Sequence, residues 1–321
     1  MKLLVTGGSG FVGQSLIFQL MTFTNYKVYV AVRELVTIFP AEVAQLKFEG
    51  LSPATDWHNH LRGVECVIHT AAHVHIMSVA STNPLNDFRQ VNTKATLNLA
   101  KQAAASGVNR FIYLSSIKVN GEVTLPGRPF TTNNTFIPTD PYALSKYEAE
   151  QGLLNLAKET NMEIVIIRPP LVYGAGVKAN FLTMMRWVYK GIPLPLGAVH
   201  NRRSLVALDN LVNFIIHCID HPKAANEVFL ISDGEDVTTT NLLQKVAKAF
   251  GKKALLLPVP VNLMKLAAKL LGKGDVADRL FCSLQVDSSK AQKLLGWQPV
   301  ITMDEQLKKT VDTYLENEKI L

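Results

Sequence analysis

The chain has 321 residues, of which 48% are hydrophobic and 18% charged, a composition that excludes a disordered protein and allows one large domain or two small ones. Lysine and arginine (33) exceed aspartate and glutamate (26), and the net charge of +7 suits either a solvated basic surface or an anionic ligand such as a nucleotide diphosphate. The basic residues are scattered, so we expect no nucleic-acid partner.

Neither a membrane-spanning segment nor a disulfide framework is expected. No apolar run reaches the roughly 20 residues that span a bilayer, and an apolar strand begins at residue 2 with no signal peptide before it. The three cysteines, Cys66, Cys218 and Cys282, are widely separated, and no Cys/His spacing suggests zinc. We therefore predict a cytoplasmic protein with no metal ion and no membrane partner.

Strand and helix patterns alternate through the first 170 residues. Strands are predicted at Lys2–Thr6, Lys27–Val32, Glu65–His69, Arg110–Ser115 and Glu163–Arg168. Helices are predicted at Phe11–Met21, Phe88–Ser106 and Pro141–Thr160. This alternation predicts an α/β fold with a doubly wound parallel sheet that has helices on both faces.

After residue 170 the pattern changes, and glycines and prolines interrupt short elements as far as about residue 200. Strand, helix and strand patterns return at Leu205–Leu208, Asp209–Asp220 and Glu227–Ile231, and the chain from 237 onward is mostly helical. We predict a nucleotide-binding domain of residues 1–170, with returning elements at about 201–234. Residues 171–200 and 235–321 are expected to form a smaller, mixed α/β substrate-binding lobe.

A glycine-rich loop, residues 6–13 (TGGSGFVG), joins the first predicted strand to the first helix. Gly7 permits a tight turn, Gly10 lets backbone amides approach a pyrophosphate, and Gly13 lets the helix pack close to the sheet. A glycine triplet alone is weak evidence, but this one follows a strand and precedes an amphipathic helix, as the motif requires. The loop therefore predicts a Rossmann-like, dinucleotide-binding fold.

An acid–base pair is predicted at the start of the helix that begins at Pro141. Tyr142 and Lys146 are four residues apart, so their side chains share one face of that helix. A phenol has a pKa of about 10, and a nearby ammonium lowers it, which makes tyrosine usable as an acid–base group. Ser115 and Ser116 end a predicted strand at the sheet edge where ligands bind, and a hydroxyl there can hydrogen-bond a substrate oxygen beside Tyr142.

The glycine spacing and the Ser, Tyr and Lys set resemble the short-chain dehydrogenase/reductases, and at this length their extended branch of nucleotide-sugar epimerases, reductases and dehydratases. The resemblance covers essentially the full chain, and its Ser-x-x-Val-x-Gly register makes Ser116 the catalytic serine, with Ser115 as the fallback. It implies that Tyr142 moves the proton and that Lys146 holds both the phenol's pKa and the nicotinamide ribose. The implied cofactor contacts are Gly7, Gly10, Phe11, Val12, Gly13, Arg33, Thr70, Ala71, Ala72, Asn92, Ser115, Tyr142, Lys146 and Pro169.

The end of the second strand bears on the choice of cofactor. Relatives that use NAD usually carry an Asp there, whereas this chain has Arg33, a guanidinium where a 2′-phosphate would lie. Gly50 stands where the family commonly has an Asp near the adenine. Both departures favour NADP over NAD, but Glu34 opposes the argument, and an exposed loop arginine is the alternative interpretation of Arg33.

The resemblance also bears on the substrate. Ile117 and Lys118 occupy the positions where 4,6-dehydratases carry an Asp-Glu pair, so dehydratase chemistry is not expected. Leu171 replaces an Asn that reaches the substrate diphosphate in relatives. The implied substrate contacts are Ser116, Asn180, Arg202, Arg203 and, most weakly, Arg279, while Phe181 and Trp187 are expected to pack inside the lobe.

Within the branch, the chain looks most similar to reductases of bacterial surface-polysaccharide synthesis, which act on a UDP-4-keto-6-deoxy-N-acetylhexosamine. Our main hypothesis is therefore an NAD(P)-dependent reductase acting at C4 of a nucleotide-activated hexose. The alternative is a UDP-hexose 4-epimerase, which uses the same groups twice, and a non-enzymatic NAD(P)-sensing protein is a remote third. Relatives pair two long helices of each subunit, so the resemblance also implies a homodimer.

Overall fold

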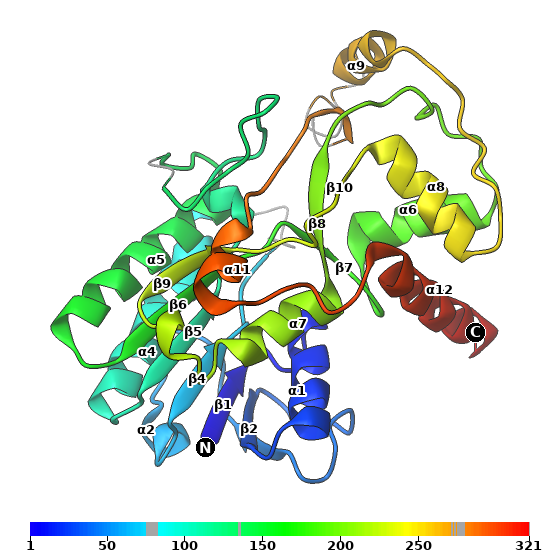
Figure 1. The fold of residues 1–321 in the computed structure, drawn as a ribbon. Coiled ribbons are helices and arrows are strands. Elements are labelled where there is room, and N and C mark those ends of the chain that lie inside the picture. Colours follow the sequence, from blue (N-terminus) through cyan, green and yellow to red (C-terminus); the bar gives the residue numbers. More distant parts are fainter. Residues whose placement is uncertain (75–82, 134–135, 271, 273, 275–279, 321) are drawn as a thin grey trace.

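The computed structural model describes residues 1–74, 83–133, 136–270, 272, 274 and 280–320 (Figure 1). Its central feature is a seven-stranded parallel sheet in the order β3-β2-β1-β4-β5-β6-β9. The strands are β1 (Lys2–Thr6), β2 (Lys27–Val32), β3 (Ala44–Lys47), β4 (Cys66–His69), β5 (Arg110–Leu114), β6 (Glu163–Arg168) and β9 (Glu227–Leu230). Edge strand β3 was not predicted, because its four residues (AQLK) lack the apolar run of a buried strand.

Helices cover both faces of this sheet (Figure 1). One face carries α1 (Phe11–Phe23), α7 (Leu208–His217) and α11 (Ser289–Leu295), and the other carries α2 (His58–Leu61), α4 (Thr96–Ala105) and α5 (Pro141–Glu159). Successive residues of a strand point to opposite faces, so in β1 Leu3 and Val5 enter the first core and Leu4 enters the second. The predicted α/β, doubly wound, Rossmann-like fold is confirmed.

The segment predicted as one helix, Phe88–Ser106, is built differently. It comprises the end of α3 (Pro84–Phe88), a π-helical stretch η1 (Arg89–Ala95) and then α4. The wider π-helical turn brings Asn92 and Thr93 into the interior, where both are buried and hydrogen-bonded. Apolar spacing along the sequence is compatible with either kind of helix, and so it did not reveal the π-helical turn.

A second, three-stranded sheet has the order β10-β8-β7 and consists of β7 (Leu171–Tyr173), β8 (Arg203–Ala207) and β10 (Asp236–Val237). A third core packs it with α6 (Ala179–Tyr189), α8 (Thr239–Ala249) and α12 (Met303–Ile320). Phe181 is buried in this core against Tyr173 as expected, but Trp187 is 45% exposed, because it lies on the outer side of α6.

Three further elements are the 3-10 turns η2 (Ile117–Val119) and η3 (Pro222–Ala224) and the helix α9 (Val261–Leu270). Helix α9 lies at the outer edge of the part of the molecule that contains the second sheet (Figure 1). Among the helices in the described ranges, none combines the length and the apolar character that crossing a membrane requires.

Candidate active site

The order of the strands locates a binding crevice. Chain connections run from β1 outward to β2 and β3 on one side, and from β4 outward to β5 and β6 on the other. Ligands of open parallel sheets bind at such a switch point, beyond the carboxyl ends of the strands. The glycine loop follows β1 and residues Thr70–Ala72 follow β4, so both predicted cofactor segments lie at this switch point.

The glycine loop is shaped by close backbone contacts. Gly7 has a φ of +74°, and a Cβ there would stand 2.6 Å from the backbone nitrogen of Ala71. A Cβ at Gly13 would stand 2.2 Å from the carbonyl oxygen of Gly7, which explains how α1 approaches the turn so closely. Gly8 was not singled out from the sequence, yet a Cβ there would stand 2.4 Å from Val30 Cγ1, so a side chain at this position would require the core side chains beside it to move.

The amino terminus of α1 has the properties of an anion site. Gly10 is the N-cap and provides no side-chain acceptor, and the first turn of the helix contains no acidic residue. The amides of this turn therefore lack the side-chain partners that usually satisfy them. Together with the space that Gly7 and Gly10 keep free of side chains, this arrangement fits a dinucleotide pyrophosphate, with Phe11 and Val12 in the first turn.

The chain beneath this crevice is held by buried polar contacts. His69, at the end of β4, is fully buried, with Thr6 Oγ1 at 2.6 Å from its Nδ1 and Thr96 Oγ1 at 2.9 Å from its Nε2. Burial, together with the charge of Lys146, lowers the pKa of His69 to about 3, so the imidazole is neutral at physiological pH. Thr70 donates its hydroxyl to the carbonyl oxygen of Thr6 at 2.7 Å, which joins the segments after β1 and β4.

Asn92 connects the cofactor side of the crevice to the catalytic helix. Its side chain accepts from the backbone amide of His73 at 2.8 Å and donates to the His73 carbonyl oxygen at 2.9 Å. Its Nδ2 also lies 3.1 Å from Ser145 Oγ, and that hydroxyl donates to the carbonyl oxygen of Tyr142. The sequence suggested a cofactor neighbour, and the geometry makes Asn92 a brace between the chain after β4 and α5.

Lys146 lies fully buried inside the protein. Its ammonium donates to the carbonyl oxygen of Leu114 at 2.8 Å and lies 4.4 Å from the centre of the Tyr113 ring. Burial lowers the pKa of Lys146 to about 7, and the carboxylate of Glu150 opposes that effect. The side chain is thus anchored at the carboxyl end of β5, next to the predicted serine.

Tyr142 and Ser116, which are 26 positions apart in the sequence, are brought together in the fold. Burial raises the pKa of Tyr142 to about 12; the neighbouring hydroxyl of Ser116 opposes this shift, and the charge of Asp140 adds to it. The sequence had predicted a pKa lowered by Lys146. In this state Tyr142 is a neutral phenol that can donate a proton to an oxygen beside Ser116.

Ser115 lies on the buried side of the same strand end. Its Oγ is buried and has no hydrogen-bond partner within the described part of the chain, while its amide donates to the carbonyl oxygen of Ile167 at 2.7 Å. A buried hydroxyl without a partner at this place could hydrogen-bond the ribose or the carboxamide of a nicotinamide cofactor. Pro169 is close by, since its carbonyl oxygen accepts from the amide of Ile117 at 3.0 Å.

Arg33 and Gly50 meet at the far end of the crevice. Arg33 is exposed directly after β2, and its Cδ lies 4.0 Å from the place where a Cβ of Gly50 would stand. The two departures from the family pattern are therefore neighbours in space. The absence of a side chain at Gly50 leaves room beside the guanidinium at the position expected for the adenosine.

A buried ion pair behind Lys146 was not predicted. Arg168 donates from Nε to the two carboxylate oxygens of Glu150 at 2.9 and 3.1 Å, and from Nη1 to Asn120 Oδ1 at 2.9 Å. Glu150 is four residues after Lys146 and eight after Tyr142, so all three share one face of α5. That spacing was the available signal in the sequence.

Asp140 was also missed, although its pattern is a familiar helix start. Its Oδ1 accepts from the amide of Ala143 at 2.9 Å, and Pro141 occupies the first helical turn. Lys118, at a position where dehydratases carry an acid, lies 2.6 Å from Glu122 and 3.9 Å from Asp140. The site beside Tyr142 thus contains a cation where a dehydratase would place a carboxyl group.

The predicted substrate residues are spread over the second sheet and its helices. Asn180 is exposed in the first turn of α6, and Arg202 is exposed just before β8. Arg203 is half-buried and donates to the carbonyl oxygen of Cys282 at 3.2 Å, so that arginine has a structural partner. Arg279 lies outside the described residues. Leu171 is 48% exposed on β7, so the position of the missing Asn is open to a ligand.

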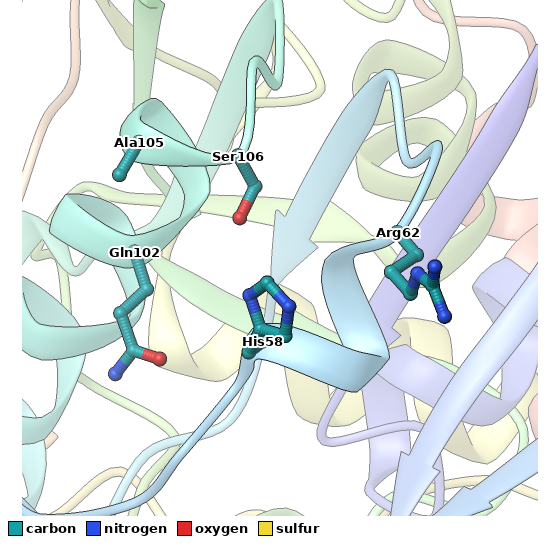
Figure 2. Close-up of a pocket in the computed structure, with 5 residues that line it drawn as sticks. All are labelled: His58, Arg62, Gln102, Ala105 and Ser106. Atoms are coloured by element: carbon teal, nitrogen blue, oxygen red, sulfur yellow. The ribbon is translucent and has the colours of Figure 1, made fainter.

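A cavity of about 270 Å³ lies elsewhere (Figure 2). His58 and Arg62 line it from α2 and the residue that follows, and Gln102, Ala105 and Ser106 line it from the end of α4. These segments precede β4 and β5, so the cavity is at the amino edge of the sheet, opposite the predicted catalytic residues. Gln102 already bonds Trp57 and Thr55, and we assign no chemistry to this cavity.

Comparison with known proteins defines the class. The model of the NAD dependent epimerase/dehydratase family matches residues 3–232, and the chain belongs to this family. The predicted membership in the epimerase and dehydratase branch is therefore confirmed.

Individual relatives lie in the same branch. A UDP-glucose 4-epimerase of Vibrio cholerae is 50% identical over 318 residues, which are 98% of this chain and 96% of the relative. Two solved structures share the fold. The UDP-glucuronic acid 4-epimerase of Bacillus cereus in complex with NAD has a TM-score of 0.79 at 20% identity, covering 98% of this chain and 99% of the other. The UDP-glucose 4-epimerase of Thermotoga maritima with UDP-glucose has a TM-score of 0.76 at 24% identity, covering 99% of this chain and 100% of the other.

Proposed function

We propose that this protein is a UDP-hexose 4-epimerase. The observation that carries the proposal is that Ser116 and Tyr142 neighbour each other beside the buried Lys146, in a chain that is 50% identical to a UDP-glucose 4-epimerase over nearly its full length. The sequence alone favoured a 4-reductase. Both reactions need the same three side chains, so the site does not separate them. The similarity to 4-epimerases supports the alternative better.

The roles of the side chains follow from their contacts. Tyr142 accepts the proton of the sugar's C4 hydroxyl in one half of the reaction and donates it back in the other. Ser116 hydrogen-bonds the same oxygen and keeps it beside the phenol. The first half needs the phenolate of Tyr142, whose pKa burial raises in the protein without ligands; we propose that the ammonium of Lys146, held by the Leu114 carbonyl, favours that phenolate when substrate and cofactor are bound. When bound, a nicotinamide cofactor supplies the reversible oxidation at C4.

We propose that the cofactor is held by the residues assembled at the switch point. Its pyrophosphate faces the first turn of α1, and Ser115, Tyr142 and Lys146 hold the nicotinamide ribose and ring. Thr70–Ala72 and Pro169 line the crevice, Asn92 supports it from behind, and Arg33 is at the adenosine end. The sugar nucleotide would lie between Ser116 and the part built from 171–200 and 235–321, with Asn180 and Arg202 as the diphosphate ligands.

The test is conversion without added cofactor. Purified protein is incubated with UDP-galactose, and separately with UDP-N-acetylgalactosamine, and the products are separated by chromatography. We expect the 4-epimer to form with no net change in absorbance at 340 nm, and NAD to be released when the protein is denatured. Absence of epimer from both substrates, with NAD supplied, would contradict the proposal.

A second candidate, the 4-reductase, has one specific observation in its favour. The position directly after β2 holds Arg33 in place of a carboxylate, and Arg33 lies exposed beside Gly50, with Glu34 next to it in sequence; an arginine there suits NADP, which a reductase must bind and release at each turnover. In addition, the half-exposed Leu171 stands where the family usually has an Asn that contacts the substrate, so the substrate side of the site also differs from the usual pattern. Consumption of one NADPH for each UDP-4-keto-6-deoxy-N-acetylhexosamine, combined with no interconversion of UDP-hexoses, would transfer the assignment to the reductase.

A further inference from the structure

Helix α9 has an apolar face that the rest of the described chain leaves uncovered. None of its residues is fully buried, and its inner side, with Val261 and Met264, packs partly against the third core. Its outer side presents Leu263, Leu266 and Leu270, which are 60, 58 and 80% exposed. These leucines follow the i, i+3, i+7 spacing of one helical stripe, and the exposed Ala267 completes it.

The segment that precedes α9 continues the same apolar surface. Leu194 is paired through its backbone with Leu255 and Leu257, with two hydrogen bonds of 2.8 Å. This pairing fixes the side-chain directions: Leu256 packs toward the third core, while Leu255 and Leu257 are 53 and 51% exposed. The backbone hydrogen bonds therefore fix Leu255 and Leu257 in orientations that point to solvent.

This part of the chain is basic. Residues 251–280 contain five lysines and one arginine against two aspartates, Asp275 and Asp278, a net charge of +4. An apolar stripe combined with lysines is typical of helices that lie in the interface of an anionic membrane. A second copy of the chain does not suit this surface, because two such segments in contact would bring lysines against lysines.

Further exposed apolar side chains lie on another loop that extends to the same end of the molecule as α9. The loop after η2 exposes Leu125, Phe136 and Ile137, and its backbone is bonded to the segment that follows α9, from the Thr124 amide to the Ser283 carbonyl oxygen. This loop and α9 both extend beyond the carboxyl ends of the strands (Figure 1). Separate apolar elements at one end of the molecule suit a fluid, flat surface better than one shaped partner.

We propose that α9, with the segment 251–260 before it, docks this protein on the surface of an anionic lipid bilayer. The leucines enter the boundary between headgroups and acyl chains, and the exposed Lys253 and Lys269 meet the anionic headgroups. The mouth of the crevice then faces the membrane. The expectation of no membrane partner rested on the lack of a spanning segment, and a helix that lies on the surface does not need one.

The test is sedimentation with vesicles, without substrate, so that it is independent of the proposed activity. The full chain is mixed with vesicles of phosphatidylcholine alone and of equimolar phosphatidylcholine and phosphatidylglycerol, at low and high salt. We expect binding to the anionic vesicles, at least about tenfold weaker binding to the neutral ones, and weakening of the anionic binding by salt.

Variants assign the binding to α9. Leu266→Glu should lower the partition coefficient on anionic vesicles by at least about tenfold. The substitution replaces an apolar side chain that enters the lipid with a negative charge that the anionic headgroups repel. The matched control is Phe23→Glu on α1, where the phenylalanine is 76% exposed on another part of the surface; it should bind like the wild type. Circular dichroism checks that both variants are folded.

Several results would overturn the proposal. These are no binding to anionic vesicles at low salt, equal binding to neutral vesicles, an unchanged Leu266→Glu variant, or an equal loss in Phe23→Glu. A Leu266→Glu variant that dissociates a dimer of the wild type in the analytical ultracentrifuge would instead make this face a contact between copies, and would also overturn it.

Discussion

The buried ammonium of Lys146 allows a quantitative test of the site without any substrate. Replacing Lys146 by Met keeps an unbranched side chain of similar length but removes the charge. Burial lowers the pKa of Lys146 from 10.5 to about 7, which corresponds to about 5 kcal/mol of destabilisation while the group is charged in the folded protein. Met also loses the hydrogen bond to the Leu114 carbonyl, which costs about 1–3 kcal/mol at every pH.

The pH dependence separates these two effects. Below pH 7 the ammonium is charged in both the folded and unfolded states, and the full burial cost is present. Between about pH 7 and 10.5 only the unfolded state holds the proton, so the free energy of unfolding of the wild type rises with pH relative to Lys146→Met. The slope is up to about 1.4 kcal/mol per pH unit, which gives roughly 2–3 kcal/mol between pH 7 and pH 9.

The assay is urea unfolding of both proteins at several pH values, with no nucleotide added. The difference in free energy of unfolding between wild type and variant is plotted against pH, which cancels the other titrating groups. Lys158→Met is the matched control, because Lys158 is exposed near the end of the same helix, and its difference should be flat. A flat difference for Lys146→Met over this range would refute the argument from burial.

Four further predictions concern the site and the assembly. Tyr142→Phe should lower turnover by roughly 10² to 10⁴ while nucleotide binding, measured by calorimetry, is retained; turnover above a tenth of the wild-type value would contradict its role. Glu150→Gln should lower the free energy of unfolding by about 3–5 kcal/mol in urea titrations, because Arg168 is then buried without its carboxylate, and a loss under 1 kcal/mol would show that Arg168 finds another partner. If the protein is the 4-reductase, the unmodified protein should bind NADPH more tightly than NADH, and Arg33→Ala should remove most of the preference; equal affinities in the wild type would dismiss the role of Arg33. In sedimentation at micromolar concentration we expect a homodimer, and a single species of about the 35.4 kDa chain mass would rule it out.

Local features of the sequence carried most of the fold. The alternation of apolar strands and amphipathic helices was sufficient for the parallel sheet, because strands buried on both faces must be apolar throughout. Strand β3 was missed for the same reason, since an edge strand with the residues AQLK needs no such run. The π-helical turn around Asn92 was missed because it shifts the backbone hydrogen bonds by only one residue, and the spacing of the apolar residues remains compatible with an α-helix.

For the site, the sequence by itself determined the features that depend on residues close together in the chain. These are the glycines of the loop, whose missing Cβ atoms the turn requires, and the four-residue spacing that places Tyr142 and Lys146 one helical turn apart. The tertiary structure decided the energies of those groups. Lys146 has a pKa of about 7 because β5 and α5 close around it. Tyr142 meets Ser116 because Ser116 follows the carboxyl end of β5 and helix α5, which crosses over to the parallel strand β6, begins at that same edge of the sheet. Desolvation depends on everything packed around an atom, including residues far away in the chain, and so it is set only when the chain has folded.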